Sequence, residues 1–387
     1  MNRKLDAVTA EKLYADRHFA VELLDRQTGR IAVECRREAP GAVGKWQLET
    51  DGVRHSFGQF FLSGMKAGEK REFLLSVEVP DLPYGVSAVL NVRISDENGG
   101  LLSAESFPLP PPSRFFPEKS SEQFFCGVRF DVSQAIISSG KLSAVIDANG
   151  MRELRCNGEK LLLSGPRLSL WRPGMVPENM ADLKLDRLRV AADRFVSNGS
   201  SVECHALALP SRMEMDELEF TQRFTPQDDG SLRYDMEFVV PQSFEYIPRL
   251  GVEMRLPGTM DDLSFFGRGP HENYPGDKSG IVSLHHMKVA DCYPDLPSAV
   301  SAGSRSEVRF LTLSDGEHSH VLTVRGGMAF SFSALPFSDF AVEDAMKAST
   351  MPAAENGIYL HIDCRIGDKM PVRAGLYRMT IFFSSAK

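Results

Sequence analysis

A short segment between residues 265 and 280 gathers most of the side chains with which this protein could do chemistry. Its glycines and two prolines predict a loop, because such residues cannot continue a regular strand. A polar and aromatic loop between apolar strands is typical of a binding site. The alternative is an ordered connection whose polar groups bond each other and the nearby backbone. The polar and aromatic residues are Arg268, His271, Glu272, Asn273, Tyr274, Asp277 and Lys278.

The segment resembles a signature of a known family. The run Gly-Arg-Gly-Pro-His-Glu-Asn-Tyr-Pro, residues 267–275, is similar to a motif of the β-galactosidase small-chain domain in glycoside hydrolase family two. Residues 17–105 are similar to the immunoglobulin-like domain that precedes it in the family. Further pieces follow in the family's order: LSLWR (168–172), LDRL (185–188), YIPRLGVEMRL (246–256), SFSALPF (331–337) and NGIYLHID (356–363).

The resemblance implies an all-β chain of two domains. We expect an immunoglobulin-like β-sandwich over residues 1–107 and a proline-rich linker over residues 108–118. Residues 119–387 would form the small-chain domain, a large antiparallel β-sandwich of the galactose-mutarotase-like type. The proline run at 108–112 supports the linker on its own, since polyproline is extended and semi-rigid.

The implied function is structural. The chain would be the non-catalytic C-terminal region or small subunit of a β-galactosidase-like glycoside hydrolase, which cleaves terminal β-D-galactosides. It would brace and complete the active site of a catalytic barrel in the rest of the enzyme or in another chain. In the family an aromatic residue of this domain stacks on the substrate, and the matching position is Tyr359. The alternative is that Tyr359 packs in the sandwich as a strand residue.

We expect no catalytic residue in this chain. A retaining glycosidase needs two carboxyl groups about 5 Å apart, and the family keeps both glutamates in an upstream barrel. Nothing here alternates strand and helix as a barrel must. Glu272 and Glu355 are isolated carboxylates, which are usually solvated or hydrogen-bonded. Whether the assembled enzyme is active stays open.

Three departures from the family pattern concern positions that normally face the active site. The segment that begins at Trp171 lacks the family's aspartates, the glycine-rich motif is reduced to residues 367–370, and no histidine occurs near Met346. The signature segment itself is retained. This contrast indicates a preserved scaffold with an altered substrate contact.

The elements that must position these residues are mostly strands. Apolar and polar residues alternate over residues 30–36, 72–79 and 231–240, as in half-buried antiparallel strands. Turn dipeptides separate such runs: Asp51-Gly52, Asn98-Gly99, Asn149-Gly150, Asn157-Gly158 and Asp229-Gly230. Helical patterns are confined to residues 9–16 and to a capped helix over residues 338–347.

Composition excludes several classes of protein. A net charge of −8 without a basic stripe argues against nucleic-acid binding. No run approaches the length of a membrane span. The start has no apolar run after its basic residues, so we expect no signal peptide and a cytoplasmic protein. The six cysteines form no CxxC pair, and the sequence predicts no metal or cofactor.

Two other functions are also compatible with the sequence. The chain could be an independent carbohydrate-binding module that uses the concave face of the sandwich. It could also be a sugar epimerase, which would need a positioned histidine and glutamate such as His271 and Glu272. The partners expected from the leading interpretation are a catalytic large chain and a galactoside at the shared site. Association with copies of itself is left open.

Overall fold

The computed structural model describes residues 17–78, 88–109, 124–174, 185–209, 216–244, 247–277, 280–293, 302–317, 319–367 and 372–385. Over these ranges the chain consists of antiparallel strands with one α-helix and three short 3-10 turns. The all-β fold class predicted from the sequence is confirmed. Residues 9–16, for which a helical turn is predicted, lie outside the described ranges.

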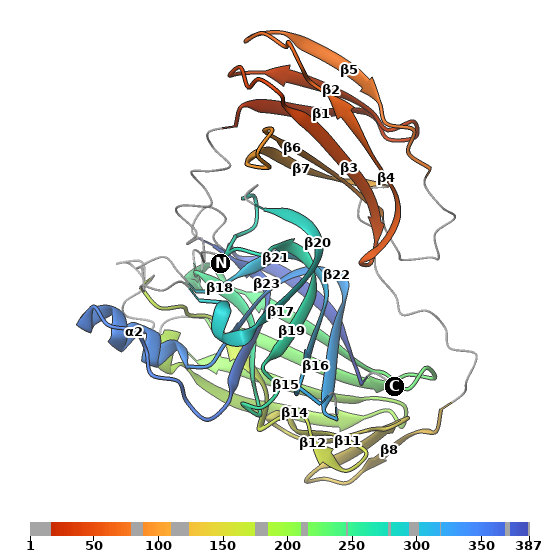
Figure 1. Cartoon of the computed structure of the whole chain (residues 1–387). Helices are drawn as coiled ribbons and strands as arrows, with labels where there is room; N and C mark the ends of the chain where they lie inside the picture. Colours follow the sequence, from red (N-terminus) through yellow and green to blue (C-terminus); the bar gives the residue numbers. More distant parts are fainter. Residues whose placement is uncertain are drawn as a thin grey trace.

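The N-terminal part is a sandwich of two sheets, drawn in red and orange in Figure 1. One sheet has the strand order β1-β2-β5 and the other the order β4-β3-β6-β7. Apolar side chains such as Ile31, Leu48 and Val92 fill the space between the sheets. The strands are Phe19–Asp25 (β1), Arg30–Cys35 (β2), Val43–Thr50 (β3), Val53–Phe61 (β4), Lys70–Leu74 (β5), Ala88–Ser95 (β6) and Leu101–Leu109 (β7).

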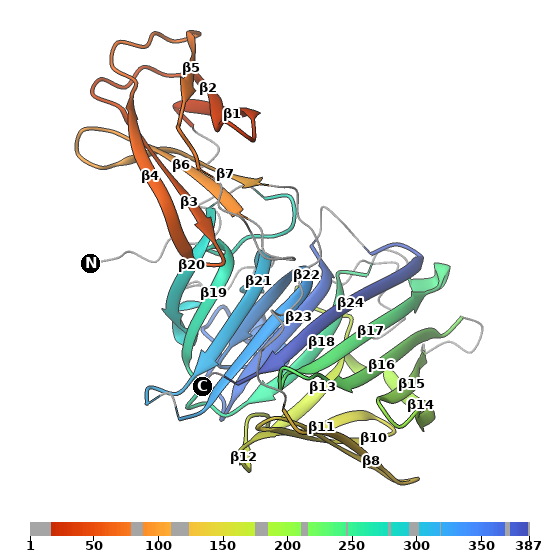
Figure 2. The same cartoon turned by 90° about the vertical axis from the view of Figure 1, so that its right-hand side faces the viewer.

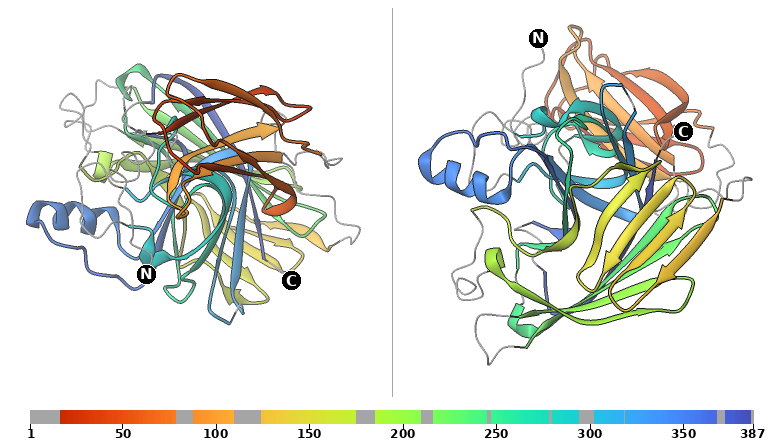
Figure 3. Two further views of the ribbon diagram at one scale, coloured as in Figure 1. Left: turned by 45° about the horizontal axis from the view of Figure 1, so that its top comes forward. Right: turned by 90° about the horizontal axis from the view of Figure 1, so that it is seen from below.

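The C-terminal part is a larger sandwich in which a five-stranded sheet covers one face of a twelve-stranded sheet (Figures 2 and 3). The smaller sheet has the order β12-β11-β10-β9-β8. Its buried residues, such as Ile137 and Leu154, share one core with Phe220 and Phe238 of the larger sheet. The strands are Cys126–Phe130 (β8), Ala135–Ser139 (β9), Leu142–Asp147 (β10), Gly150–Cys156 (β11) and Glu159–Lys160 (β12).

The larger sheet follows the order β13-β18-β23-β22-β24-β17-β16-β15-β14, and β21, β19 and β20 extend it from β22. Several neighbours in this order, such as β13 and β18 or β17 and β24, are far apart in the sequence, so the sheet brings distant residues together. Its strands are Ser164–Ser169 (β13), Arg189–Ser197 (β14), Val202–Leu209 (β15), Leu218–Pro226 (β16), Leu232–Val240 (β17), Arg249–Leu256 (β18), Asp262–Gly269 (β19), Ile281–Lys288 (β20), Arg305–Ser314 (β21), Val321–Leu335 (β22), Ile358–Ile366 (β23) and Gly375–Ser384 (β24).

Strand β17 illustrates how the alternating pattern determines burial. Leu232, Tyr234, Met236, Phe238 and Val240 are all buried in the core, and the polar residues between them point to the other face. Such period-two burial is what a pleated strand with one covered face requires. The strand predicted over residues 231–240 is therefore confirmed.

Turns and the helix also follow their local signals. Asp51 and Gly52 both have positive φ in the tight β3–β4 turn, which aspartate and glycine tolerate. Helix α2 spans Asp339–Ala348 and begins after Ser338, whose side chain accepts a hydrogen bond from the Ala341 amide. The short 3-10 turns are Leu185–Arg187 (η2), Gln242–Phe244 (η3) and Val289–Asp291 (η4).

Two predicted elements need correction. The strand expected over residues 72–79 ends at Leu74, because Ser76 has a positive φ of 48° that breaks the extended backbone. The loop expected over residues 265–280 begins only after Gly269, since β19 continues to that residue. Glycine is needed inside β19 because a Cβ at Gly267 would lie 2.7 Å from the Val308 side chain. The glycines therefore mark close packing of strands.

The two parts of the chain meet where β6 and β7 approach β20. Asn91 donates a hydrogen bond to the Val282 carbonyl at 2.9 Å, and the Val282 amide donates to Ser106 at 2.9 Å. Ser283 donates to the Glu49 carboxylate at 2.8 Å. A small buried apolar cluster lies beside these bonds: Val89, Phe266 and Val282.

Each part has a hydrophobic core of its own, and this supports a boundary between β7 and β8. Strand β7 runs to Leu109, so the linker predicted over residues 108–118 overlaps its end. Residues 110–118 lie outside the described ranges, and the division into domains stays a proposal. Among the described residues, no helix has the length and apolar character to cross a membrane.

Candidate functional site

A cleft of about 380 Å³ opens at one edge of the larger sheet, between β13, β18, β23 and the first turn of α2. The cleft combines aromatic rings with carboxylate, hydroxyl and guanidinium groups. We therefore treat it as the candidate site. Its polar and aromatic lining residues are Arg167, Ser169, Trp171, Asp186, Glu253, Ser338, Asp339, Phe340 and Tyr359.

Sheet register brings the polar residues of the cleft together. In β18 the side chains of Val252 and Met254 are buried in the core, so Glu253 between them faces away from it. Glu253 pairs with Arg167 of β13 on one side and with His361 of β23 on the other. Residues directly opposite each other on antiparallel strands interact through their side chains. The register thus sets a row of polar groups across three strands.

Aromatic rings form the wall of the cleft near α2. The rings of Trp171 and Phe340 lie 5.2 Å apart, and Phe340 is largely exposed. Tyr359 is the second residue of β23 and lines the same cleft. Its hydroxyl donates to the Glu355 carboxylate at 2.5 Å, and the Arg255 guanidinium lies 5.3 Å from its ring centre. Tyr359 is therefore a strand residue that also faces the cleft.

A fully buried arginine, Arg249, bonds the lining residue Asp339. Arg249 Nη1 donates to Asp339 Oδ2 at 2.8 Å and to the Trp171 carbonyl at 3.3 Å, and its Nε lies 3.2 Å from Asp363 Oδ1. Burial raises the pKa of Asp363 to about 7, although Arg249 opposes the rise. A buried charge is retained only when it is paired, so these three groups depend on each other.

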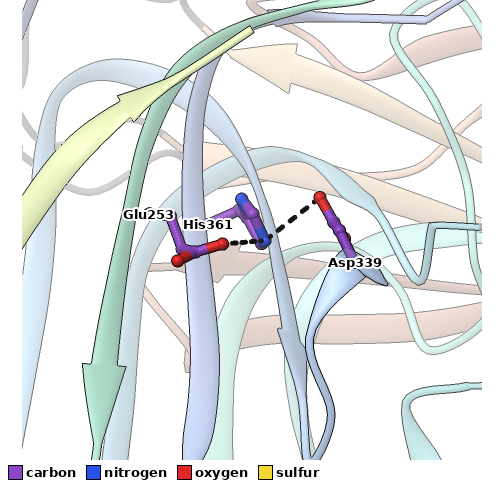
Figure 4. A group of neighbouring side chains, drawn as sticks. All are labelled: Glu253, Asp339 and His361. Atoms are coloured by element: carbon purple, nitrogen blue, oxygen red, sulfur yellow. Dashed lines mark ion pairs between the residues drawn. The ribbon is translucent and has the colours of Figure 1, made fainter. Parts of the chain in front are cut away.

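Glu253 and Asp339 line the cleft, and Figure 4 shows the His361 ring between their carboxylates. His361 is buried, and its Nε2 lies 3.5 Å from Glu253 Oε2 and 3.6 Å from Asp339 Oδ2. Burial and the nearby Arg249 hold the pKa of His361 well below its usual value. Burial, and next the Asp339 carboxylate, raise the pKa of Glu253 to about 7. Such a carboxyl group can give or take a proton near neutral pH.

Glu253 and Asp339 do not form a glycosidase pair, despite their proximity. Oxygen atoms of the two side chains lie within 4.8 Å of one another, near the spacing of a retaining enzyme. The Asp339 side chain is almost inaccessible and bonded to Arg249, and His361 lies against both carboxylates. The Asp339 carboxylate is therefore not free to act on the anomeric carbon of a sugar. The cleft is thus suited to binding rather than to hydrolysis.

The signature segment lies in another part of the same domain, and its polar groups bond within the protein. Arg268 forms a two-pronged ion pair with Glu307 at 2.8 and 3.1 Å and donates to the Gly280 carbonyl at 3.0 Å. Asn273 Nδ2 donates to the carbonyls of Arg268 and His271, and its Oδ1 accepts from the amide and hydroxyl of Ser306. These bonds tie the turn after β19 to the start of β21.

Glu272 and Tyr274 make a second set of contacts. Glu272 Oε1 accepts hydrogen bonds from the amides of Ala302 and Gly303 and from the Tyr274 hydroxyl. A buried carboxylate engaged in this way is not available as the partner of His271 in epimerase chemistry. His271 is partly buried, and this burial, with the charge of Arg305, lowers its pKa.

A cation–π contact connects the signature segment with the cleft. The Arg172 guanidinium lies 4.8 Å from the centre of the Tyr274 ring. Arg172 follows the cleft residue Trp171 and is itself buried. The segment therefore contacts a residue next to the cleft lining and does not itself line the cleft.

Sequence reasoning singled out Tyr359, as a substrate contact or a packed strand residue, but missed Glu253, Asp339, Arg249 and His361. The segments that contain Glu253 and His361 were noted only for their resemblance to the family, and one polar residue between apolar ones is normal for any half-covered strand. The signal that distinguishes these positions is their pairing across strands, and a single sequence does not contain it.

Comparison with known families now identifies the larger domain. The β-galactosidase small chain family matches residues 138–367, more than half of the sequence. The chain belongs to the β-galactosidase small-chain family. The matched range includes β13, β18, β23, α2 and the signature segment, so the cleft and this segment are both parts of the small-chain domain.

The chain is also similar to parts of known β-galactosidases. The chain is 26% identical to a β-galactosidase of Priestia megaterium over 134 residues, which is 34% of this chain and 13% of that protein. It is 27% identical to one of Lactobacillus delbrueckii subsp. bulgaricus over 305 residues, which is 73% of this chain and 29% of that protein. The chain therefore spans less than a third of the length of these relatives.

Solved structures resemble this chain only distantly. A putative aldose 1-epimerase from Escherichia coli K12 is 9% identical with a TM-score of 0.36, over 68% of this chain and 99% of that one. A GalM/aldose epimerase homologue from C. elegans is 10% identical with a TM-score of 0.29, over 78% and 96%.

Proposed function

We propose that this chain is the non-catalytic C-terminal region or small subunit of a family-two β-galactosidase. The N-terminal sandwich would be the family's immunoglobulin-like domain. The small-chain domain would brace a catalytic barrel and complete its active site for a terminal β-D-galactoside. The barrel belongs to the rest of the enzyme or to a separate large chain.

One observation supports this proposal above the others. The chain covers 13% and 29% of the two β-galactosidase relatives, so most of each relative corresponds to nothing in it. The described residues agree, because the Asp339 carboxylate near Glu253 is buried and paired with Arg249. Hydrolysis would therefore need groups from elsewhere.

The test is an assay with an aryl β-galactoside. The purified chain alone should not hydrolyse it above background. Co-expression with a β-galactosidase catalytic barrel that lacks its own small-chain region should give a complex that does. Turnover by the isolated chain that disappears in Glu253→Gln would overturn the proposal, and so would a large chain that is fully active without this chain.

Within the assembled enzyme, we propose that Tyr359 contacts the substrate. A tyrosine has an apolar face for a sugar ring and a polar tip, and this ring lines the cleft beside Trp171 and Phe340. Tyr359→Ala should raise KM for the galactoside severalfold with a smaller effect on kcat. Tyr359→Phe keeps the ring and should stay close to wild type. Equal kcat and KM values for Tyr359→Ala and wild type would show that Tyr359 does not contact the substrate.

An independent carbohydrate-binding function is the second candidate, favoured by the cleft itself. Its aromatic wall and the partly exposed Glu253 lie within this one chain. Calorimetry of the isolated chain with galactosides separates the two functions. Two results together would favour the independent carbohydrate-binding function. They are saturable binding that is lost in Phe340→Ala and the failure of the chain to form a complex with a large chain.

A further inference from the structure

The structure assigns a metal site to the inner end of the cleft: we propose that Glu253, Asp339 and His361 bind one divalent transition-metal ion of the zinc class. The three residues come from β18, α2 and β23 and are widely separated in the sequence, which explains why no metal motif is apparent there. An imidazole with two carboxylates is a ligand set that zinc accepts. The inference is independent of the proposed β-galactosidase role.

Distances are the first argument. The His361 Nε2 atom lies 3.5 Å from Glu253 Oε2 and 3.6 Å from Asp339 Oδ2. Both separations are too long for a good hydrogen bond. They are close to the separation of two ligands on one tetrahedral ion, which is about 3.4 Å for metal–ligand bonds of about 2.0–2.1 Å. The three ligand atoms all lie within 4.8 Å of one another, so a single ion can reach them (Figure 4).

The second argument is an unsatisfied buried atom. His361 is 1% exposed, and its Nε2 has no hydrogen-bond partner among the described residues. Buried polar atoms in native proteins are nearly always partnered. This nitrogen points between two carboxylates, as Figure 4 shows, and an ion held by all three groups would satisfy it.

The surroundings supply outer contacts of the kind that metal ligands have. Arg249 bonds Asp339 at 2.8 Å and fixes that carboxylate. The Ser169 hydroxyl lies 3.3 Å from His361 Nδ1 and can accept a hydrogen bond from an Nδ1–H group. The neutral ring then has its lone pair on Nε2, where it can bind the ion. The side chain of Glu253 is 30% exposed, so an ion can enter from the cleft and keep a position open to water.

Arg249 also permits a second hydrogen-bond arrangement, in which His361 could not bind a metal. Its Nη1 lies 3.0 Å from His361 Nδ1 and can only donate. If Nδ1 accepts from Arg249, the proton of the neutral ring moves to Nε2, and Nε2 cannot bind a metal. Nη1 has two hydrogens, and Asp339 Oδ2 and the Trp171 carbonyl can take both. We infer that Nη1 donates to these two oxygens, and not to His361, when the ion is bound.

The test is titration of the full chain, stripped of metal with a chelator, with Zn²⁺ and separately with Co²⁺. Calorimetry should give one Zn²⁺ per chain and a higher melting temperature with Zn²⁺, since a ligand of the folded state stabilises it. Bound Co²⁺ should show the visible absorption of a four- or five-coordinate ion. Glu253→Gln, which alters the most exposed ligand, should weaken binding roughly tenfold or more.

A surface group offers a matched control. His205 also lies between two carboxylates, Asp193 at 2.9 Å and Glu219 at 3.5 Å, but each contacts a different ring nitrogen. One ion cannot use both, so Glu219→Gln should bind Zn²⁺ like wild type. Equal loss in the two variants would mean an adventitious surface site and overturn the proposal.

Two further results would also overturn it. One is the absence of stoichiometric binding by a folded wild-type chain. The other is ¹⁵N NMR of His361 that shows a protonated Nε2 and an accepting Nδ1 in excess Zn²⁺. If His361→Gln fails to fold, Glu253→Gln together with the NMR measurement still decides the question.

Discussion

Asn273 is the residue on which the order of the signature segment most depends. It is 1% exposed, and its side chain bonds two carbonyls on one side and Ser306 on the other. Asn273→Ala would leave these buried groups without partners and should cost about 1–3 kcal/mol in the free energy of unfolding. Urea unfolding measures this loss. Arg268→Ala should destabilise the chain similarly, because the Gly280 carbonyl loses its donor.

Asn356 provides the control, because it is exposed and lies outside the segment. Asn356→Ala should change stability little. If Asn273→Ala and Arg268→Ala also leave the unfolding midpoint unchanged, the segment does not serve the fold, and a role in binding a sugar or a partner replaces it.

His285 should make stability depend on pH at the residue scale. Burial, with the charges of Arg93 and Arg305, lowers its pKa to about 4, although its ring bonds the Ile281 carbonyl. Between the ordinary value of 6.5 and about 4, the unfolded chain takes up a proton that the folded chain refuses. Stability should therefore fall as the pH falls through this window. Urea midpoints between about pH 7 and pH 5 should drop more steeply for wild type than for His285→Gln. Parallel curves would contradict the assignment.

At the scale of elements, the start of α2 is the point to test. Ser338 caps the helix through its side chain, and its hydroxyl donates to the Glu355 carboxylate at 2.7 Å. The next residue, Asp339, lines the cleft. Ser338→Ala should cost about 1 kcal/mol, because the Ala341 amide loses its acceptor. Ser338→Asp keeps an acceptor there and should recover part of the loss. Thermal unfolding compares the three proteins, and equal stability of all three would show that the cap is dispensable.

At the scale of the whole molecule, the contact between the two sandwiches should couple their unfolding. Asn91 is buried at this interface and bonds Val282 across it. Asn91→Ala leaves the Val282 carbonyl without its donor and should cost about 1–3 kcal/mol. Calorimetry should then show an earlier or a separate transition for the N-terminal sandwich. Asn98→Ala, at an exposed turn of the same sandwich, is the control. The same profile for both variants would mean that the sandwiches unfold independently.

Local patterns predicted the strands better than they predicted where each strand ends. The alternation in β17 agrees with the structure from Leu232 to Val240 because burial of one face determines it. The strand after Lys70 ends early because of the backbone of Ser76, which hydrophobic alternation does not reveal. The loop predicted from residue 265 begins only after Gly269. Gly267 lies inside β19 because a side chain there would clash with Val308 of another strand, and the sequence does not reveal this contact.

The sequence by itself determined the all-β class, most turns, helix α2 and, through the signature at residues 267–275, the family. These properties depend on neighbours in the chain or on a contiguous motif. Only the tertiary structure decided that Glu253, Asp339 and His361 meet beside Tyr359. Strand β18 lies between β13 and β23, although some 80 and 100 residues separate them from it in the sequence. Such pairings arise from the packing of the whole sheet, because strand order and register are collective properties that no local segment encodes.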